Sequence, residues 1–305
     1  MKAPKDIGAS VRNRLAKIAR DRRENTQLLL TRFAIERVLY RLSVSRHRER
    51  FVLKGAMLFS LWAPTPYRAT GDLDLLGLSD NAPGAIASVF KEVLALSVED
   101  DGMRFRLETI QAAPARPEDE YAGVRVKFVA ELAGARLPIQ VDIGYGDAIT
   151  PGSVEIDYPS LVGLAEPRLK AYPPETVVAE KFQALAELGM LNSRMKDFFD
   201  LWAIAGAFNF DGAVLARAIK TTFDRRGTPL PTETPVALTP AFAEEKQGQW
   251  KAFLNRTEIA LAPDPLPEIQ MRIAQLTMPP ALAMANSVEF ARRWVPCGPW
   301  SVDPA

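Results

Sequence analysis

The sequence predicts a mixed α/β core followed by a mainly helical C-terminal region. Up to about residue 165, segments with the alternating pattern of strands are interspersed with segments of helical periodicity. Beyond that point the pattern becomes helical. A length of 305 residues fits one large domain or two closely packed ones. We therefore expect basic helices and the core in residues 1–165, and the helical region in residues 166–305.

The elements of the core follow from apolar spacing and turn residues. Apolar residues three and four apart predict a helix over residues 7–23 with a basic outer face. A second helix, more apolar and so more buried, is expected over residues 26–42. The other predicted elements are a strand at 51–56 ending in glycine, the first turns of a helix at 57–62, a strand at 72–76, a helix at 85–96 and strands at 105–110, 123–130 and 137–143.

The C-terminal region is punctuated by proline and glycine. Pro173-Pro174 opens a predicted helix that ends near Gly189, and another helix is expected over residues 194–207. Four prolines within residues 226–240 predict a surface loop.

Composition narrows the classes of site. With one cysteine (Cys297) and one histidine (His47), the chain has no His/Cys cluster for zinc. A divalent ion would need oxygen ligands, which favours Mg²⁺ or Mn²⁺. No apolar run approaches the ~20 residues of a membrane span, and no signal peptide is visible, so we expect a cytoplasmic protein without a membrane partner.

The charge is unevenly distributed. Residues 1–50 carry a net charge of +9 and the remaining residues −8. One interpretation is a basic arm that meets phosphate groups. The other is a pair of solvated helices whose arginines pair with acidic residues elsewhere.

Two aspartates on one predicted strand are the first candidates for chemistry. Because successive side chains of a strand alternate between faces, Asp72 and Asp74 share one face, and Leu73 and Leu75 share the other. Adjacent carboxylates repel unless a cation lies between them, so the pair suits a divalent ion that bridges triphosphate oxygens. The alternative is two exposed acidic residues on an edge strand.

A third aspartate lies near the end of a later predicted strand. Asp142 could join the same pocket if its strand lies beside the one that carries Asp72 and Asp74. Three carboxylates could then hold two metal ions. The alternative is a solvated strand end that caps the following turn.

In combination, these motifs resemble the AbiEii toxin family of nucleotidyltransferases, which is related to the MenT toxins and more distantly to DNA polymerase β. The motifs that carry the resemblance, in chain order, are Lys54-Gly55-Ala56, Arg68-Ala69-Thr70-Gly71-Asp72-Leu73-Asp74, Asp142, Pro174-Glu175 through Glu180-Lys181-Phe182, and Arg194 through Asp200. The match spans roughly residues 50–205. Ala56 stands where the family often has a second glycine, and alanine is still small.

The resemblance implies a role for each matching residue. Lys54, Gly55, Ala56 and Thr70 would lie at the triphosphate, Asp72 and Asp74 would bind metal, Lys181 would contact phosphate, and Asp197 or Asp200 would complete the site. Structural alternatives remain for the C-terminal motifs. Lys181 could be a solvated helix residue, and the spacings Arg194–Asp197 and Lys196–Asp200 also fit ordinary surface ion pairs.

The resemblance further implies a DNA polymerase β-like core and a metal-dependent transfer of NMP from an NTP to an acceptor hydroxyl. The acceptor would be RNA, especially the 3′ end of tRNA, and a cognate antitoxin would be the genetic partner. Two rivals stay open: a transferase that modifies a protein or a small molecule, and a nucleotide- or RNA-binding module without catalysis. A histidine-dependent hydrolase and P-loop or Rossmann sites are disfavoured, because their motifs are missing from the sequence.

Overall fold

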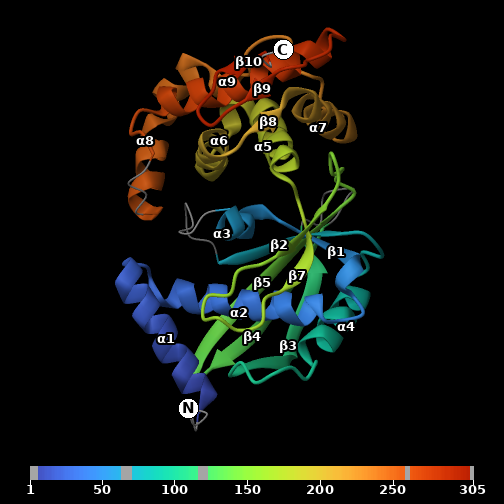
Figure 1. Cartoon of the computed structure of the whole chain (residues 1–305), viewed down its shortest axis with the longest axis vertical. Helices are drawn as coiled ribbons and strands as arrows, with labels where there is room; N and C mark the ends of the chain where they lie inside the picture. The colour runs from blue at the N-terminus through green and yellow to red at the C-terminus, as the bar shows by residue number, and fades with distance from the viewer. Residues whose placement is uncertain (1–5, 63–70, 116–122, 258–261, 303–305) are drawn as a thin grey trace. The chain divides into compact units, whose positions relative to one another are not determined.

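The computed structural model describes residues 6–62, 71–115, 123–257 and 262–302. The chain divides into two compact units (Figure 1). The first unit comprises residues 1–146 and 154–171, and the second comprises residues 147–153 and 172–305. A mixed sheet with helices forms the first unit and helices dominate the second, which confirms the predicted fold class.

A seven-stranded mixed sheet forms the centre of the first unit, in the order β3-β4-β5-β2-β1-β7-β6. Neighbouring strands are antiparallel except β2 with β5 and β1 with β7, which are parallel. The strands are β1 (Phe51–Lys54), β2 (Asp72–Gly77), β3 (Met103–Pro114), β4 (Val124–Leu132), β5 (Ala135–Tyr145), β6 (Val154–Asp157) and β7 (Arg168–Ala171). β2 is therefore a central strand.

Two helices, α2 (Thr26–Ser43) and α4 (Pro83–Leu94), pack against one face of this sheet (Figure 1). Phe90 of α4 contacts Phe51 of β1 and Phe128 of β4, with ring centroids 6.1 and 6.4 Å apart. The basic helix α1 (Ile7–Arg22) begins at Asp6, whose carboxylate accepts a hydrogen bond from the amide of Ala9. The short α3 (Leu58–Trp62) follows a turn of 3₁₀ helix, Gly55–Met57, directly after β1.

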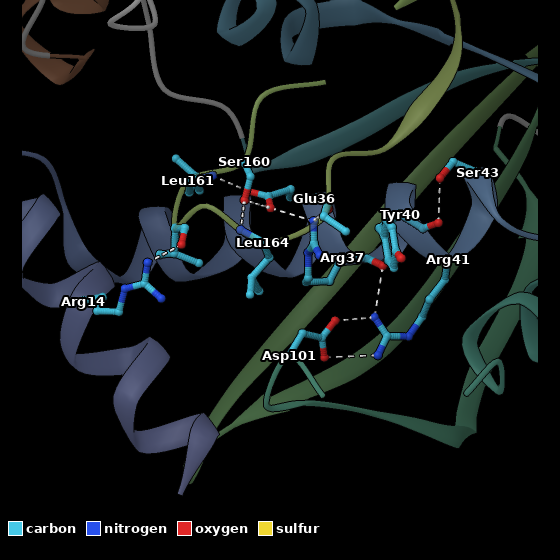
Figure 2. A network of polar contacts seen from close by, with 12 residues as sticks. Arg14, Glu36, Arg37, Tyr40, Arg41, Ser43, Asp101, Ser160, Leu161 and Leu164 are labelled. Atoms are coloured by element: carbon cyan, nitrogen blue, oxygen red, sulfur yellow. Dashed lines mark hydrogen bonds and ion pairs between the residues drawn. The ribbon is translucent and has the colours of Figure 1, made fainter. Parts of the chain in front are cut away.

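Helix α2 is buried, as predicted, but it takes charged side chains into the interior (Figure 2). The guanidinium of Arg41 donates two hydrogen bonds to the carboxylate of Asp101, at 2.7 and 3.1 Å. The guanidinium of Arg37 donates to Glu36 and to the carbonyl of Ala165, both at 2.8 Å. A buried charge is tolerated when it is paired and hydrogen-bonded, and these pairs meet that condition.

The pairing of arginines with acidic residues thus accounts for much of the basic N-terminal segment. On α1 the outcome is different, because the side chains of Arg20 and Arg23 at its end are exposed. An exposed basic surface therefore remains at the end of α1, and whether it meets phosphate groups stays a prediction.

The second unit is a helical assembly with a small three-stranded sheet, β10-β9-β8. Its helices are α5 (Pro174–Leu188), α6 (Met195–Ala207), α7 (Gly212–Arg225), α8 (Pro240–Thr257) and α9 (Leu266–Ala285), and its strands are β8 (Phe210–Asp211), β9 (Arg293–Trp294) and β10 (Trp300–Ser301). The predicted helices at Pro174 and near Arg194 are confirmed. Residues 226–239 form the predicted loop, interrupted by the 3₁₀ turn Val236–Leu238, and Pro240 already begins α8.

Within the described parts of the chain, no helix is both long and apolar enough to cross a membrane.

Candidate active site

Asp72, Asp74 and Asp142 are brought together by the pairing of two neighbouring strands. β2 and β5 run parallel, and their register places Asp74 beside Asp142 and Asp72 beside Gln140. The expectation that the strand of Asp142 lies next to that of the two other aspartates is confirmed. The edge-strand interpretation of Asp72 and Asp74 is wrong, because β2 lies between β5 and β1.

The opposite face of β2 is apolar and fully packed. Leu73 and Leu75 are at most 1% exposed, and their neighbours Val141 and Ile143 on β5 are equally buried. Phe128, which contacts α4, lies on this same face, so the aspartates lie on the face away from α4. The buried face fixes the strand, and the strand fixes the direction of the three carboxylates.

Gly55 is the residue that lets β1 end against the carboxylate of Asp74. Its φ is +73°, and a Cβ added there would lie 2.0 Å from Oδ2 of Asp74. Glycine is therefore required twice, for the left-handed backbone and for the close approach. The resemblance assigns Gly55 and Ala56 to the triphosphate, whereas the contact seen in the structure is with a carboxylate. Ala56 itself is 8% exposed, and Lys54 is paired in register with Asp74.

Arg125 on β4 is a site residue that sequence reasoning missed. Its Nε donates to Oδ1 of Asp142 at 2.7 Å and its Nη2 donates to Oδ2 at 3.1 Å. Nε2 of Gln140 also donates to Oδ2, at 3.1 Å. Asp142 is therefore not a solvated strand end, because its carboxylate is held by an arginine and an amide. Only the register between β4 and β5, which pairs Arg125 with Asp142, reveals this contact.

The charges of Asp142 and Asp72 both act on Arg125. The hydrogen bond to Asp142 is the main cause that raises the pKa of the guanidinium, and the charge of Asp72 adds to it. Arg125 thus offsets negative charge where three carboxylates converge. With 39% of its side chain exposed, it can still exchange partners.

The donors fit a divalent cation in part. Carboxylate oxygens are the hard ligands that Mg²⁺ and Mn²⁺ prefer, and Asp72 and Asp74 offer them on one strand face beside the cradle at Gly55. Asp142 is engaged by Arg125 instead. Accordingly, no group of three or more His, Cys, Asp or Glu side chains in the described ranges is arranged around one metal position.

The C-terminal motifs form a separate ion cluster inside the second unit. Nζ of Lys181 on α5 lies 2.7 Å from Asp197 and 2.8 Å from Asp200, both on α6. Arg194 also pairs with Asp197, at 2.7 Å. Both aspartate side chains are fully buried and that of Lys181 is 14% exposed, so Lys181 is not a solvated helix residue. The predicted ion pair between Arg194 and Asp197 forms, but the carboxylate of Asp197 is buried and not at the surface.

The remaining predicted site residue, Thr70, lies outside the described residues together with Arg68. The structure thus groups the predicted residues in two sets. Asp72, Asp74 and Asp142 lie together on β2 and β5. Lys181, Asp197 and Asp200 lie together on α5 and α6.

Comparison with known proteins matches most of the chain to one family. A family model for the nucleotidyl transferase AbiEii toxin of type IV toxin–antitoxin systems matches residues 37–274. A candidate nucleotidyltransferase from H. pylori is 14% identical with a TM-score of 0.48, over 87% of this chain and 99% of that chain. JHP933 from Helicobacter pylori is 13% identical with a TM-score of 0.48, over 86% and 95%. No curated protein matches the chain.

The matched range includes both groups of aspartates and Lys181. It leaves out α1 and the first part of α2.

Proposed function

Because this chain belongs to the AbiEii nucleotidyltransferase toxin family, we propose that it transfers NMP from an NTP to the 3′ hydroxyl of an RNA, with tRNA as the acceptor. The family supplies the nucleotidyltransferase activity, the NTP substrate and a type IV toxin–antitoxin context. The dependence on Mg²⁺ or Mn²⁺, the RNA acceptor and a cytoplasmic site of action belong to the proposal.

The observation that carries the proposal is the grouping of Asp72, Asp74 and Asp142 on adjacent central strands, one of them in contact with Gly55. Such a grouping concentrates negative charge on a half-exposed surface, which costs free energy unless a cation offsets it. The arrangement therefore suits the binding of a cation together with a polyphosphate.

In the proposed reaction the acceptor oxygen forms a bond to the α-phosphorus of the NTP. The bond from that phosphorus to the oxygen that bridges to the β-phosphate breaks, pyrophosphate leaves, and the hydroxyl proton is released to water. A divalent cation held by Asp72 and Asp74 would supply positive charge to the phosphate oxygens.

The chain's own residues orient and balance this site. Gly55 leaves room for Asp74, and the buried leucines behind β2 hold both aspartates on one face. Arg125 and Gln140 fix the carboxylate of Asp142 and lower the repulsion among the three acids. Positioning of this kind accounts for most of what a protein contributes to phosphoryl and nucleotidyl transfer.

The participation of Lys181, Asp197 and Asp200 remains a proposal that rests on the order of the motifs. Within the second unit the ammonium of Lys181 is shared by two buried carboxylates, which fixes its position. A fixed cation can stabilise charge that develops on a phosphate without reorganising. The same cluster would also serve to join α5 to α6, and its variants must therefore separate the two roles.

The test is incubation of the purified protein with each labelled NTP, total tRNA and Mg²⁺. We expect label in RNA with one preferred nucleotide, and no label with Asp74→Asn. Label in protein would overturn the RNA acceptor while keeping the activity. Absence of label from every acceptor, with a folded protein, would contradict the proposed reaction.

The antitoxin is expected to act as a genetic partner that need not bind the chain. Expression of the wild-type chain should arrest growth, and Asp74→Asn should not. Growth arrest by Asp74→Asn at equal expression would separate toxicity from nucleotidyl transfer.

A further inference from the structure

A pocket in the first unit lies apart from the three aspartates. It has a volume of about 360 Å³ and lies among the end of α1, helices α2 and α3, and residues 158–161. None of the site aspartates lines it. A volume of this size is at the lower end of small-molecule pockets. Arg22 and Arg32, which line it, precede the range matched by the family model.

Two guanidinium groups give the pocket positive character. Arg32, with a side chain 6% exposed, donates to Glu24 at 3.1 Å and to the hydroxyl of Ser60 at 3.3 Å. Arg22 lies 3.9 Å from the same carboxylate of Glu24. In the part of the chain that the structure describes, Arg22 and Arg32 thus both pair with the carboxylate of Glu24. Burial lowers the pKa of Arg32 more than Glu24 raises it, so a further anion would be favourable.

The acidic residue that lines the pocket, Glu36, acts on the charge of Arg32 but is bonded to other groups. One of its oxygens accepts hydrogen bonds from Arg37 and from the hydroxyl of Ser160, at 2.8 and 3.0 Å. The other accepts from the amide of Leu161 at 2.9 Å, so the carboxylate is fully engaged (Figure 2). Arg22 and Arg32 are therefore the lining groups that an anionic ligand would contact.

Another part of the wall is aromatic and apolar. Trp62 and Tyr158 line it with Leu61 and Pro159. The ring of Trp62 packs edge-on against Phe59, with centroids 5.5 Å apart, which holds its orientation. Guanidinium groups beside an aromatic ring in the wall of a pocket are the chemistry that recognises a phosphate joined to a planar base.

We propose that this pocket binds a nucleoside 5′-monophosphate unit, with the phosphate at Arg22 and Arg32 and the base against Trp62. The unit is either a free nucleotide or part of a nucleic-acid strand, since both present the same groups.

The experiment measures binding alone, without divalent cations, to the full-length Asp74→Asn protein. Isothermal titration uses each nucleoside monophosphate, inorganic phosphate and a 5′-phosphorylated oligoribonucleotide. Loss of transfer in the wild-type protein would not affect this measurement, so the two proposals fail independently. We expect a nucleoside monophosphate to bind more tightly than inorganic phosphate.

Trp62→Ala should weaken that binding about tenfold, the scale of one base–aromatic stack. Arg22→Ala should weaken it about fivefold, the scale of one partly exposed charge contact. Matched controls are Trp202→Ala, which removes a tryptophan of the second unit, and Arg104→Ala, which removes an exposed arginine of β3. Both controls should bind within about twofold of the parent, a change of roughly 0.4 kcal/mol that lies within measurement error.

Binding of the oligoribonucleotide distinguishes a free nucleotide from a nucleic-acid strand as the natural ligand. Tighter binding of the strand, with the same losses in Trp62→Ala and Arg22→Ala, identifies a strand, and failure of the strand to bind identifies a free nucleotide. The proposal is overturned by equal affinity for inorganic phosphate, by unchanged affinity in a folded Trp62→Ala and Arg22→Ala, or by competition from NTP with Mg²⁺ at one common site in the wild-type protein.

Discussion

The two groups of aspartates differ in what surrounds them. In the first unit Asp72 is exposed and Asp74 and Asp142 are half-buried on a sheet face. In the second unit Asp197 and Asp200 are fully buried and bonded to Lys181. Carboxylates at a solvated surface can exchange a protein cation for a ligand at small cost, whereas buried pairs cannot do so without desolvated charge being left behind. The exposed aspartates of the first unit are therefore suited to bind a substrate, whereas the buried aspartates of the second unit stabilise the fold.

The largest effect is expected from Asp72→Asn and Asp74→Asn. Each should lower transfer by at least about 10³-fold, because the amide keeps the shape but removes the charge that holds a cation. The melting temperature should be unchanged or higher, since repulsion between carboxylates is relieved. The control Asp157→Asn removes an exposed carboxylate of β6 and should retain activity. Normal transfer by Asp72→Asn or Asp74→Asn would show that the exposed aspartates of the first unit do not bind the substrate's cation.

Lys181→Ala tests whether the buried cluster has more than a structural role. It leaves Asp197 and Asp200 without this cation, so we expect a loss of about 3–5 kcal/mol in stability. Transfer should fall about 10²-fold if the ammonium acts on phosphate.

A neutral cluster separates these effects. In Lys181→Met combined with Asp197→Asn and Asp200→Asn no buried charge is left unpaired, and stability should largely recover. Transfer measured beside thermal melts decides the outcome: recovery of both would make the cluster purely structural.

Gly55→Ala should disturb the aspartates of the first unit through a change in the backbone beside Asp74. A positive φ costs alanine about 1–2 kcal/mol, and the added Cβ would also displace Asp74. Gly134→Ala is the matched control, because its φ is +82° and no atom lies within 4 Å of the added Cβ. Both variants should lose stability in chemical denaturation, but only Gly55→Ala should lose transfer. Equal activity of the two would show that the contact with Asp74 is unimportant.

Arg125→Ala should have a smaller effect on transfer, and it should act only through the aspartates of the first unit. Removing the guanidinium adds repulsion among the three aspartates, and we expect KM for the NTP to rise about fivefold, roughly 1 kcal/mol. The Mg²⁺ concentration for half-maximal activity should fall, because the cation no longer competes with Arg125 for Asp142. Arg104→Ala on β3 serves as the control, and an unchanged Mg²⁺ dependence would contradict the competition.

The smallest effect is expected from the basic helix α1. Arg20→Glu with Arg23→Glu should weaken RNA binding and flatten its salt dependence, with the slope reduced by about two for two lost phosphate contacts. Arg22 is left in place because it lines the pocket. Lys91→Glu with Lys251→Glu makes the same change of charge elsewhere. If both double variants behave alike in a salt titration, α1 contributes only net charge.

The sequence by itself determined most elements up to β5, helices α5 and α6, and the faces of the predicted strands. The alternation around Leu73 placed Asp72 and Asp74 together, because side-chain direction along a strand is a local property. Helices α1, α2, α5 and α6 were likewise predicted from spacing and from proline and glycine, which act within a few residues. The order of the motifs pointed to the family that the comparison then identified.

Only the tertiary structure decided what each charge meets. The pairing of Arg125 with Asp142, the contact of Gly55 with Asp74 and the joining of Lys181 to Asp197 and Asp200 each depend on the register of strands or the packing of helices. The small sheet β8–β10 and the pocket at Arg32 arise in the same way. Local spacing carries no information about such partners, because the energy of a charge is set by burial and by groups distant in the chain.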